Sequence, residues 1–159
     1  MRVLPADPGL RLTVHCDGAA RGNPGPAGIG VVVSGAGGRV LAEIAEGIGV
    51  ATNNVAEYLA AIAGLRRARE LGATRVLLRS DSKLLIEQLS GRFRVKNPTL
   101  VRLHTEARRL ASGFEEVRFE HVPRERNRHA DRLANRGVDQ WLAGEGAGYE
   151  PPEPSPGLF

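Results

Sequence analysis

Residues 10–28 read LRLTVHCDGAARGNPGPAG, and this stretch carries the clearest folding signal in the chain. Apolar Leu10, Leu12 and Val14 alternate with polar residues, which is the pattern of a half-buried strand. A cluster of Gly and Pro residues follows Asp17 and predicts a shaped turn. We therefore expect the fold to begin with a strand that ends at a carboxylate.

Two more strands are predicted directly after this turn. Apolar residues alternate with others through 29–33 and again through 40–44. The link between these segments, SGAGG at 34–38, contains the glycines that allow positive φ in a chain reversal. The first three strands are therefore expected to form an antiparallel meander.

The second half of the chain switches between helical and strand patterns. Apolar side chains recur at helical spacing through Asn54–Leu71, and Gly72 terminates that helix. The apolar segment Thr74–Ser80 is typical of a buried strand, which a helical crossover places parallel to its neighbour. The remaining predicted elements are a helix at Ser82–Leu89, a basic loop at Gly91–Asn97, a helix at Pro98–Ala111, a strand at Glu116–Val122 and a helix at Asn127–Leu142. This order predicts an α/β fold with a mixed five-stranded sheet, three antiparallel strands followed by parallel ones, flanked by helices.

Composition limits the class of protein. The chain has 159 residues, 42% of them hydrophobic and 25% charged, as in ordinary globular proteins of one domain. No apolar run approaches the roughly 18 residues of a membrane span, so we expect no membrane partner and a cytoplasmic protein. We also expect a monomer. The single Cys16 excludes an intramolecular disulfide, and the Cys and His residues lack the spacing of structural zinc sites.

The net charge is positive and unevenly distributed. The chain has 22 Lys and Arg residues against 18 Asp and Glu residues, and only Lys83 and Lys96 are lysines. Residues 143–159, AGEGAGYEPPEPSPGLF, are expected to be a disordered acidic tail, because Gly and Pro prevent a packed element. Over residues 1–142, the expected catalytic domain, 22 basic residues face 15 acidic ones, a charge of +7. This charge favours an anionic partner such as nucleic acid, although a GC-rich genome would also raise the arginine content.

Four carboxylates stand at the predicted junctions between elements. Asp17 and Asp81 end the first and fourth strands, Glu57 lies in the first turn of a helix, and Asp131 opens the last helix. In open α/β sheets such strand ends meet at the ligand site. Four carboxylates gathered there repel one another unless divalent cations bind, and oxygen-only ligands suit Mg²⁺ or Mn²⁺.

Each carboxylate also has a purely structural alternative. Asp17 could bond its own turn, Glu57 could form a capping box with Asn54, and Asp81 could cap the next helix. Asp131 could pair with Arg128 one turn earlier.

The motifs around these carboxylates closely resemble the type 1 ribonuclease H family. They are DGAARGNPGPAG at 17–28, TNNVAE at 52–57, SDS at 80–82 and HADRLA at 129–134, in a match that covers about residues 10–137. The resemblance implies a ribonuclease H-like fold and an endonuclease, a hydrolase that cleaves the RNA strand of RNA/DNA hybrids and leaves 5′-phosphate and 3′-hydroxyl ends. It also implies that Asp17, Glu57, Asp81 and Asp131 are catalytic ligands of two Mg²⁺ ions, or Mn²⁺, when substrate is bound. Asp17 would bridge the ions, Glu57 and Asp81 would lie on the leaving-group side, and Asp131 would lie on the nucleophile side.

The same resemblance implies residues that contact nucleic acid. Gly18 and Gly22 would let the backbone approach a strand, Asn23 and Thr52 resemble phosphate-binding residues, and Asn53 and Asn54 resemble minor-groove contacts. Lys83 follows the SDS motif where a polar family residue touches substrate, although a solvated lysine is the simpler interpretation.

Two loops depart from the family pattern. Gly91–Asn97 is short and has no Trp where many members have a basic protrusion. The loop Val122–Asn127 is shorter than in members with a mobile catalytic His, so Arg124 or Glu125 is expected to take over its role, while His121 and His129 are expected to be structural.

Two other functions remain open from the sequence. One is a noncatalytic module that binds RNA/DNA hybrid or double-stranded RNA. The other is a nuclease of the same fold that acts on RNA/RNA duplex or DNA junctions.

Overall fold

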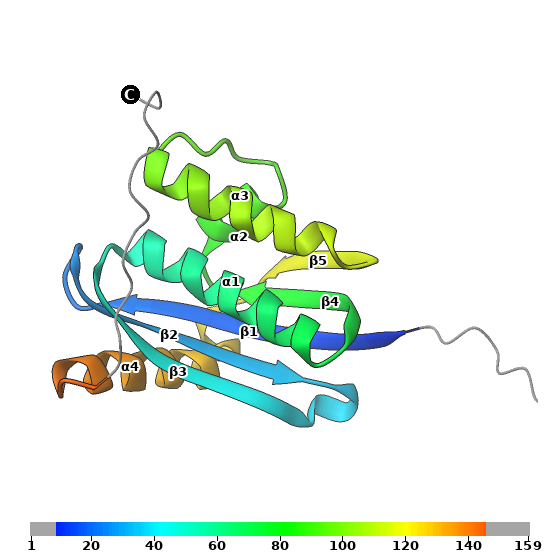
Figure 1. Cartoon of the computed structure of the whole chain (residues 1–159), viewed down its shortest axis with the longest axis horizontal. Coiled ribbons are helices and arrows are strands. Elements are labelled where there is room, and N and C mark those ends of the chain that lie inside the picture. The colour runs from blue at the N-terminus through cyan, green and yellow to red at the C-terminus, as the bar shows by residue number, and fades with distance from the viewer. Residues whose placement is uncertain (1–8, 146–159) are drawn as a thin grey trace, which may run out of the picture.

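A computed structural model describes residues 9–145 of the protein, so the tail predicted at 143–159 lies almost wholly outside the described residues. Five strands form one sheet with the order β3-β2-β1-β4-β5, and four helices cover it (Figure 1). The strands are β1 (Leu10–Ala20), β2 (Gly25–Ser34), β3 (Val40–Ala51), β4 (Ala73–Ser80) and β5 (Glu116–His121). The helices are α1 (Asn53–Glu70), α2 (Lys83–Leu89), α3 (Pro98–Ser112) and α4 (Arg128–Leu142), with short 3₁₀ turns η1 (Ala36–Gly38) and η2 (Arg124–Arg126).

The pairing of the strands confirms the predicted mixed sheet. Strands β1, β2 and β3 are antiparallel neighbours, whereas β4 runs parallel to both β1 and β5. The predicted end of the first strand was wrong, because Asp17 and Gly18 lie inside β1 and the turn comes only after Ala20. Backbone pairing explains the difference, since Asp17 is still opposite Gly30 and Ala20 opposite Ala27 on β2.

The helices lie on opposite faces of the sheet. Helices α1, α2 and α3 cover one face, and α4 packs on the other against β1, β2 and β3 (Figure 1). Helix α4 approaches very closely at Gly30, where an added Cβ would lie 2.0 Å from the carbonyl oxygen of Ala130. The absence of a side chain at this position lets the helix backbone rest almost directly on the strand.

Most of the apolar core lies between the sheet and α1. This core includes Leu12, Val14, Leu65 and Leu78, all fully buried. The Tyr58 hydroxyl donates a hydrogen bond of 2.6 Å to Gln88 Oε1 and so joins α1 to α2 inside the protein. None of the described helices is long and apolar enough to cross a membrane.

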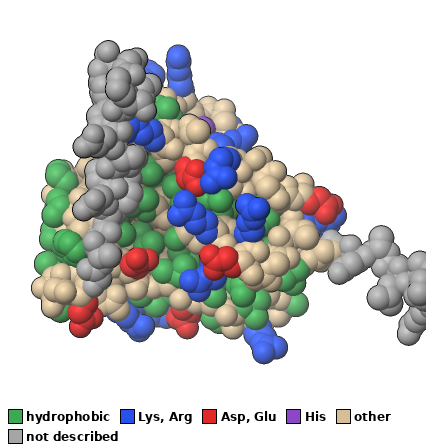
Figure 2. All heavy atoms as spheres, viewed as in Figure 1, with side chains coloured by type: hydrophobic (Ala, Val, Ile, Leu, Met, Phe, Trp, Pro, Cys, Tyr) green, Lys and Arg blue, Asp and Glu red, His purple; other side chains and the backbone are tan. Residues whose placement is uncertain are grey.

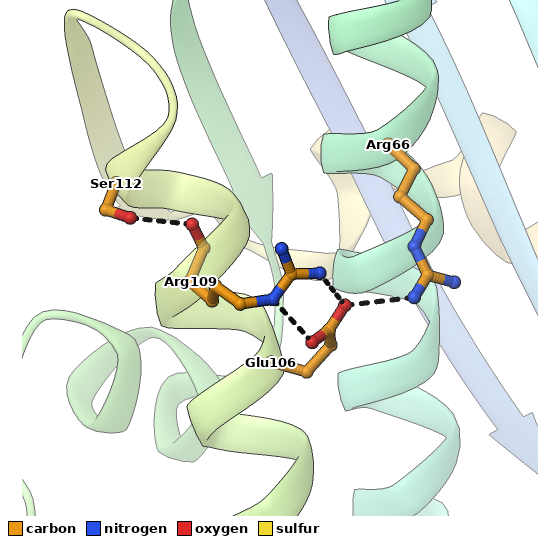
Figure 3. A network of polar contacts seen from close by, with 4 residues as sticks. All are labelled: Arg66, Glu106, Arg109 and Ser112. Carbon is orange, nitrogen blue, oxygen red and sulfur yellow. Dashed lines mark hydrogen bonds and ion pairs between the residues drawn. The ribbon is translucent and has the colours of Figure 1, made fainter.

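The outer surface of α1 and α3 carries several Arg side chains with acidic neighbours (Figure 2). Glu106 on α3 accepts hydrogen bonds from Arg66 on α1 at 3.0 Å and from Arg109 at 2.7 Å, as Figure 3 shows. The arginines of this network are largely exposed, so the ion pairs add little stability, but they connect the two helices.

Candidate metal and nucleic-acid site

Strand register brings two of the predicted carboxylates together. His15 on β1 pairs with Arg79 on the parallel strand β4, so Asp17 and Asp81, two residues further along each chain, reach the same edge of the sheet. Helix α1 adds Glu57 from its first turns. One carboxylate oxygen from each of Asp17, Glu57 and Asp81 lies within 4.8 Å of the other two. These three predicted ligands therefore form one acidic cluster.

The backbone of β1 fixes the position of Glu57. The Gly18 amide donates a hydrogen bond of 2.8 Å to Glu57 Oε1, and the Ser80 hydroxyl donates one of 3.4 Å to Oε2. A Cβ on Gly18 would lie 2.3 Å from the carbonyl carbon of Ala56, so this glycine is required where β1 meets α1. The structure thus gives Gly18 an internal packing role beside the substrate contact that the family resemblance implies.

The alternative capping roles of the acids were wrong. Helix α1 is capped by Thr52, whose hydroxyl accepts a hydrogen bond of 3.2 Å from the Val55 amide. Helix α2 is capped by Ser82, which accepts one of 3.2 Å from the Leu85 amide. Because neighbouring hydroxyls cap the two helices, the carboxylates of Glu57 and Asp81 are free to face the cluster.

Burial makes the acidic cluster electrostatically unfavourable by itself. Asp17 and Glu57 are only 5% and 4% exposed. Burial raises the pKa of Asp17, and the nearby Glu57 and Asp81 carboxylates raise it further. Burial also raises the pKa of Glu57, although the hydrogen bond from Gly18 opposes this effect. A divalent cation would offset these charges, and the oxygen-only donor set fits Mg²⁺ or Mn²⁺.

Without divalent cations, the cluster should make the protein less stable as the pH rises. The raised carboxyl pKa values mean that the folded state holds protons that the unfolded state releases near pH 4. This contribution to stability is therefore fully present below pH 4 and is lost progressively as the pH rises from there through the raised folded pKa values. We expect the melting temperature in EDTA to fall from pH 4 to pH 8 more steeply for the natural chain than for Asp17→Asn. Adding Mg²⁺ at pH 8 should restore it, and equal pH profiles for the two proteins in EDTA would contradict this account.

Asp131 reaches the site from the opposite face of the sheet. It lies in the first turn of α4 and lines the same pocket as Asp17, but it stands outside the three-residue cluster. Asn135 donates a hydrogen bond of 3.1 Å to the Asp131 backbone carbonyl, and the described residues show no pairing of Asp131 with Arg128. Asn127, directly before α4, donates one of 3.0 Å to the Cys16 carbonyl and ties the helix start to β1.

An open pocket of about 440 Å³ surrounds these carboxylates. Gly18 and Asn53 are the only predicted substrate-binding residues among its lining residues, whereas Gly22, Asn23, Thr52, Asn54 and Lys83 are not among them. The pocket lining consists of Asp17, Gly18, Ala19, Ala20, Arg21, Asn53, Glu57, Asp81, Ser82, Arg124, Asp131 and Asn135.

The other predicted substrate contacts lie in two exposed places. The Asn23 side chain accepts a hydrogen bond of 3.0 Å from the Asn53 amide, which places the turn after β1 beside the start of α1. Lys83 is exposed at the first residue of α2.

Sequence reasoning missed Arg21 and Asn135 as lining residues. Arg21 lies within the first motif and forms an ion pair of 2.8 Å with Asp139. Asn135 follows Asp131 by one helical turn, and this spacing is the signal that could have identified it.

The loop before α4 also reaches the site. Arg124 lines the pocket, and Glu125 lines an adjoining hollow that also contains Asp131. Neither His121 nor His129 is among the residues that line the carboxylate pocket. His129 Nε2 pairs with Glu43 on β3 at 2.8 Å, and His121 Nε2 lies 3.2 Å from the Asp81 carbonyl oxygen.

Comparisons with known proteins agree with this geometry. A family described as "Reverse transcriptase-like" matches residues 15–137. Ribonuclease HI of Halobacterium salinarum is 47% identical over 138 residues, covering 86% of this chain and 69% of that protein. This chain belongs to the ribonuclease HI family.

This ribonuclease HI family member is also similar to two other proteins. A Mycobacterium tuberculosis protein named as bifunctional is 50% identical over 143 residues, 89% of this chain, but the chain spans only 39% of that protein's length. The solved structure of LC11-RNase H1 in complex with RNA/DNA hybrid is 40% identical with a TM-score of 0.79, covering 82% of this chain and 99% of that one. The mixed sheet is thus a ribonuclease H fold.

Proposed function

We propose that the protein is an endoribonuclease that hydrolyses the RNA strand of RNA/DNA hybrids. The observation that carries this proposal is the cluster of Asp17, Glu57 and Asp81, whose carboxylate oxygens converge within 4.8 Å in an open pocket. The relative LC11-RNase H1, crystallised with RNA/DNA hybrid, supports this choice of substrate. The products are expected to carry 5′-phosphate and 3′-hydroxyl ends.

Four carboxylates would hold two divalent cations, Mg²⁺ or Mn²⁺, when substrate is bound. Asp17 would contact both ions, Glu57 and Asp81 the ion on the leaving-group side, and Asp131 the ion on the nucleophile side. Bound cations of this kind make an attacking water more acidic and stabilise charge on the leaving oxygen. The carboxylates would hold the ions, and none of them would form a covalent bond to the phosphate.

The start of α1 and the turn after β1 would bind the hybrid. Asn23, Asn53 and Asn54 are exposed polar side chains beside the pocket, and the first amides of a helix favour phosphate. Thr52, Gly18, Gly22 and Lys83 complete the proposed contact surface. Polar groups that reach the minor groove there could detect the 2′-hydroxyls of the RNA strand.

A panel of labelled duplexes tests the proposed function. RNA/DNA hybrid, RNA duplex, DNA duplex and a DNA junction are each incubated with Mg²⁺, Mn²⁺ or EDTA. We expect cleavage of the RNA in the hybrid with either metal and none in EDTA. Binding without cleavage would indicate a noncatalytic module, and cleavage of only the RNA duplex or the junction would indicate a nuclease with another substrate.

Arg124→Ala should lower turnover more than His129→Ala. Arg124 lines the pocket of the carboxylates, whereas His129 pairs with Glu43 on the far side of α4. Loss of a positioned cationic side chain near the reacting phosphate should reduce kcat by about tenfold. Steady-state kinetics on a hybrid would measure the difference. Equal kcat values for the two variants would show that Arg124, in the loop before α4, does not contribute to catalysis.

Two further expectations concern the state of the protein. We expect a monomer, which light scattering at assay concentration would measure, and an enzyme of the cytoplasm.

A further inference from the structure

A second hollow adjoins the carboxylate pocket and is rich in arginine. It has a volume of about 330 Å³ and is lined by Arg124, Glu125, Arg128, Asp131 and Arg132. Arg124 and Asp131 also line the carboxylate pocket, so the two hollows share a wall. Arg128 and Arg132 are one helical turn apart on α4 and therefore project from the same side of the helix.

The arginines of this hollow are not used in ion pairs within the described part of the chain. Among residues 9–145, ion pairs with Asp or Glu are formed by Arg21, Arg66, Arg67, Arg75, Arg79, Arg92, Arg109 and Arg118. The guanidinium groups of Arg124, Arg128 and Arg132 form no ion pair or hydrogen bond with any residue in that range. All three side chains are exposed.

Three arginines and two acids, Glu125 and Asp131, line the hollow, so its lining carries a net positive charge. Arg128 and Arg132 stand at i and i+4 on α4 and repel each other. An anion that enters the hollow would remove this repulsion. The planar fork of arginine binds phosphate with two parallel hydrogen bonds, which makes a phosphate oxygen the best matched ligand.

We propose that Arg128 and Arg132, with Arg124, bind a backbone phosphate of the strand that is cut, next to the scissile one. The shared wall supports this position, because a strand whose scissile phosphate lies at the carboxylates continues past Asp131 into the hollow. This proposal rests on the proposed function for the choice of strand. Arg124 and Arg128 lie outside the four sequence motifs, whereas Arg132 lies inside the motif at 129–134.

Hybrid binding in EDTA tests the hollow without any cleavage. The variant Arg128→Ala/Arg132→Ala should bind a labelled RNA/DNA hybrid about tenfold more weakly at low salt. Each lost phosphate contact should also reduce the slope of log affinity against log salt by about 1. Arg39→Ala removes an exposed arginine from the far β2–β3 hairpin and should bind as the natural chain does. Equal affinity and salt slope for the double variant and the natural chain would overturn the proposal.

Neutral linkages identify which strand occupies the hollow. Methylphosphonates in the RNA strand should abolish the difference between the natural chain and the double variant, whereas methylphosphonates in the DNA strand should preserve it. The reverse pattern would overturn the assignment to the cut strand. Because binding is measured in EDTA, this result stands apart from the duplex panel, where loss of cleavage would instead refute the proposed function.

Two controls separate binding from folding. The double variant should melt at the temperature of the natural chain, since neither arginine has a partner among the described residues. Arg128→Lys/Arg132→Lys keeps the charge and should retain the salt slope while losing part of the affinity, because lysine lacks the two-point fork. A lysine variant that binds as weakly as the alanine variant at every salt concentration would contradict phosphate binding.

Discussion

Asp17→Asn should abolish hydrolysis of RNA/DNA hybrid while leaving hybrid binding in EDTA unchanged or slightly tighter. Burial raises the pKa of the Asp17 carboxyl, and the nearby charges of Glu57 and Asp81 raise it further. Charge stabilisation by bound cations contributes several kcal/mol to such reactions, and each 1.36 kcal/mol changes the rate tenfold. We therefore expect kcat to fall by about three powers of ten or more in a gel assay with Mg²⁺.

Stability provides a second readout for Asp17→Asn. The amide removes a buried charge, so the variant should melt higher than the natural chain in EDTA at pH 8, by on the order of 5 °C. It should also gain less from added Mg²⁺. Glu70→Gln, which removes one charge from the exposed end of α1, should change neither activity nor the response to Mg²⁺. Normal turnover by Asp17→Asn would refute the assignment of the metal ligands.

Gly18→Ala should strongly destabilise the fold. Its Cβ would lie 2.3 Å from the carbonyl carbon of Ala56, and backbone cannot move aside as a flexible side chain can. Such overpacking costs about 3 kcal/mol. The Gly18 amide also holds Glu57 Oε1, so kcat at a temperature where the variant is folded should fall by about 100-fold, as expected for a shift of about 1 Å.

Gly35→Ala is the matched control for this substitution. Its Cβ would make ordinary contacts with the Leu41 side chain at 3.4 Å and the Leu12 side chain at 3.7 Å, and its backbone φ of −104° suits any residue. Chemical denaturation of both variants, followed by hybrid cleavage, separates the two effects. If Gly18→Ala and Gly35→Ala unfold at the same denaturant concentration, the contact between β1 and α1 is looser than described.

Local patterns predicted the sheet and the acidic cluster because both depend on short-range signals. Alternating apolar residues identified the strands, and the parallel pairing of β1 with β4 followed from the helical crossover between them. That pairing alone brings Asp17 and Asp81 to one edge of the sheet. The end of β1 was misplaced because the glycines after Asp17, which favour a turn, are compatible with extended pairing to β2.

Features that depend on one side chain or on distant packing were not predicted. Thr52 and Ser82 cap their helices in place of the acids beside them, a choice set by hydroxyl geometry at single positions. The packing role of Gly18 requires knowing that α1 crosses β1 at Ala56. The arginine hollow exists because the turn η2 and helix α4 bring their side chains together, which spacing along the chain does not indicate.

The contact of α4 with the sheet has a consequence for how this protein tolerates sequence change. On the α1 side, apolar side chains separate sheet from helix, and such a core accepts exchanges of similar volume. On the α4 side, backbone rests on backbone at Gly30, and the apolar cluster beside it is small, consisting of Val32, Ala130 and Leu133. The carboxylate of Asp131 therefore belongs to the less adaptable layer. Mutational drift should accumulate beneath α1 and remain rare beneath α4.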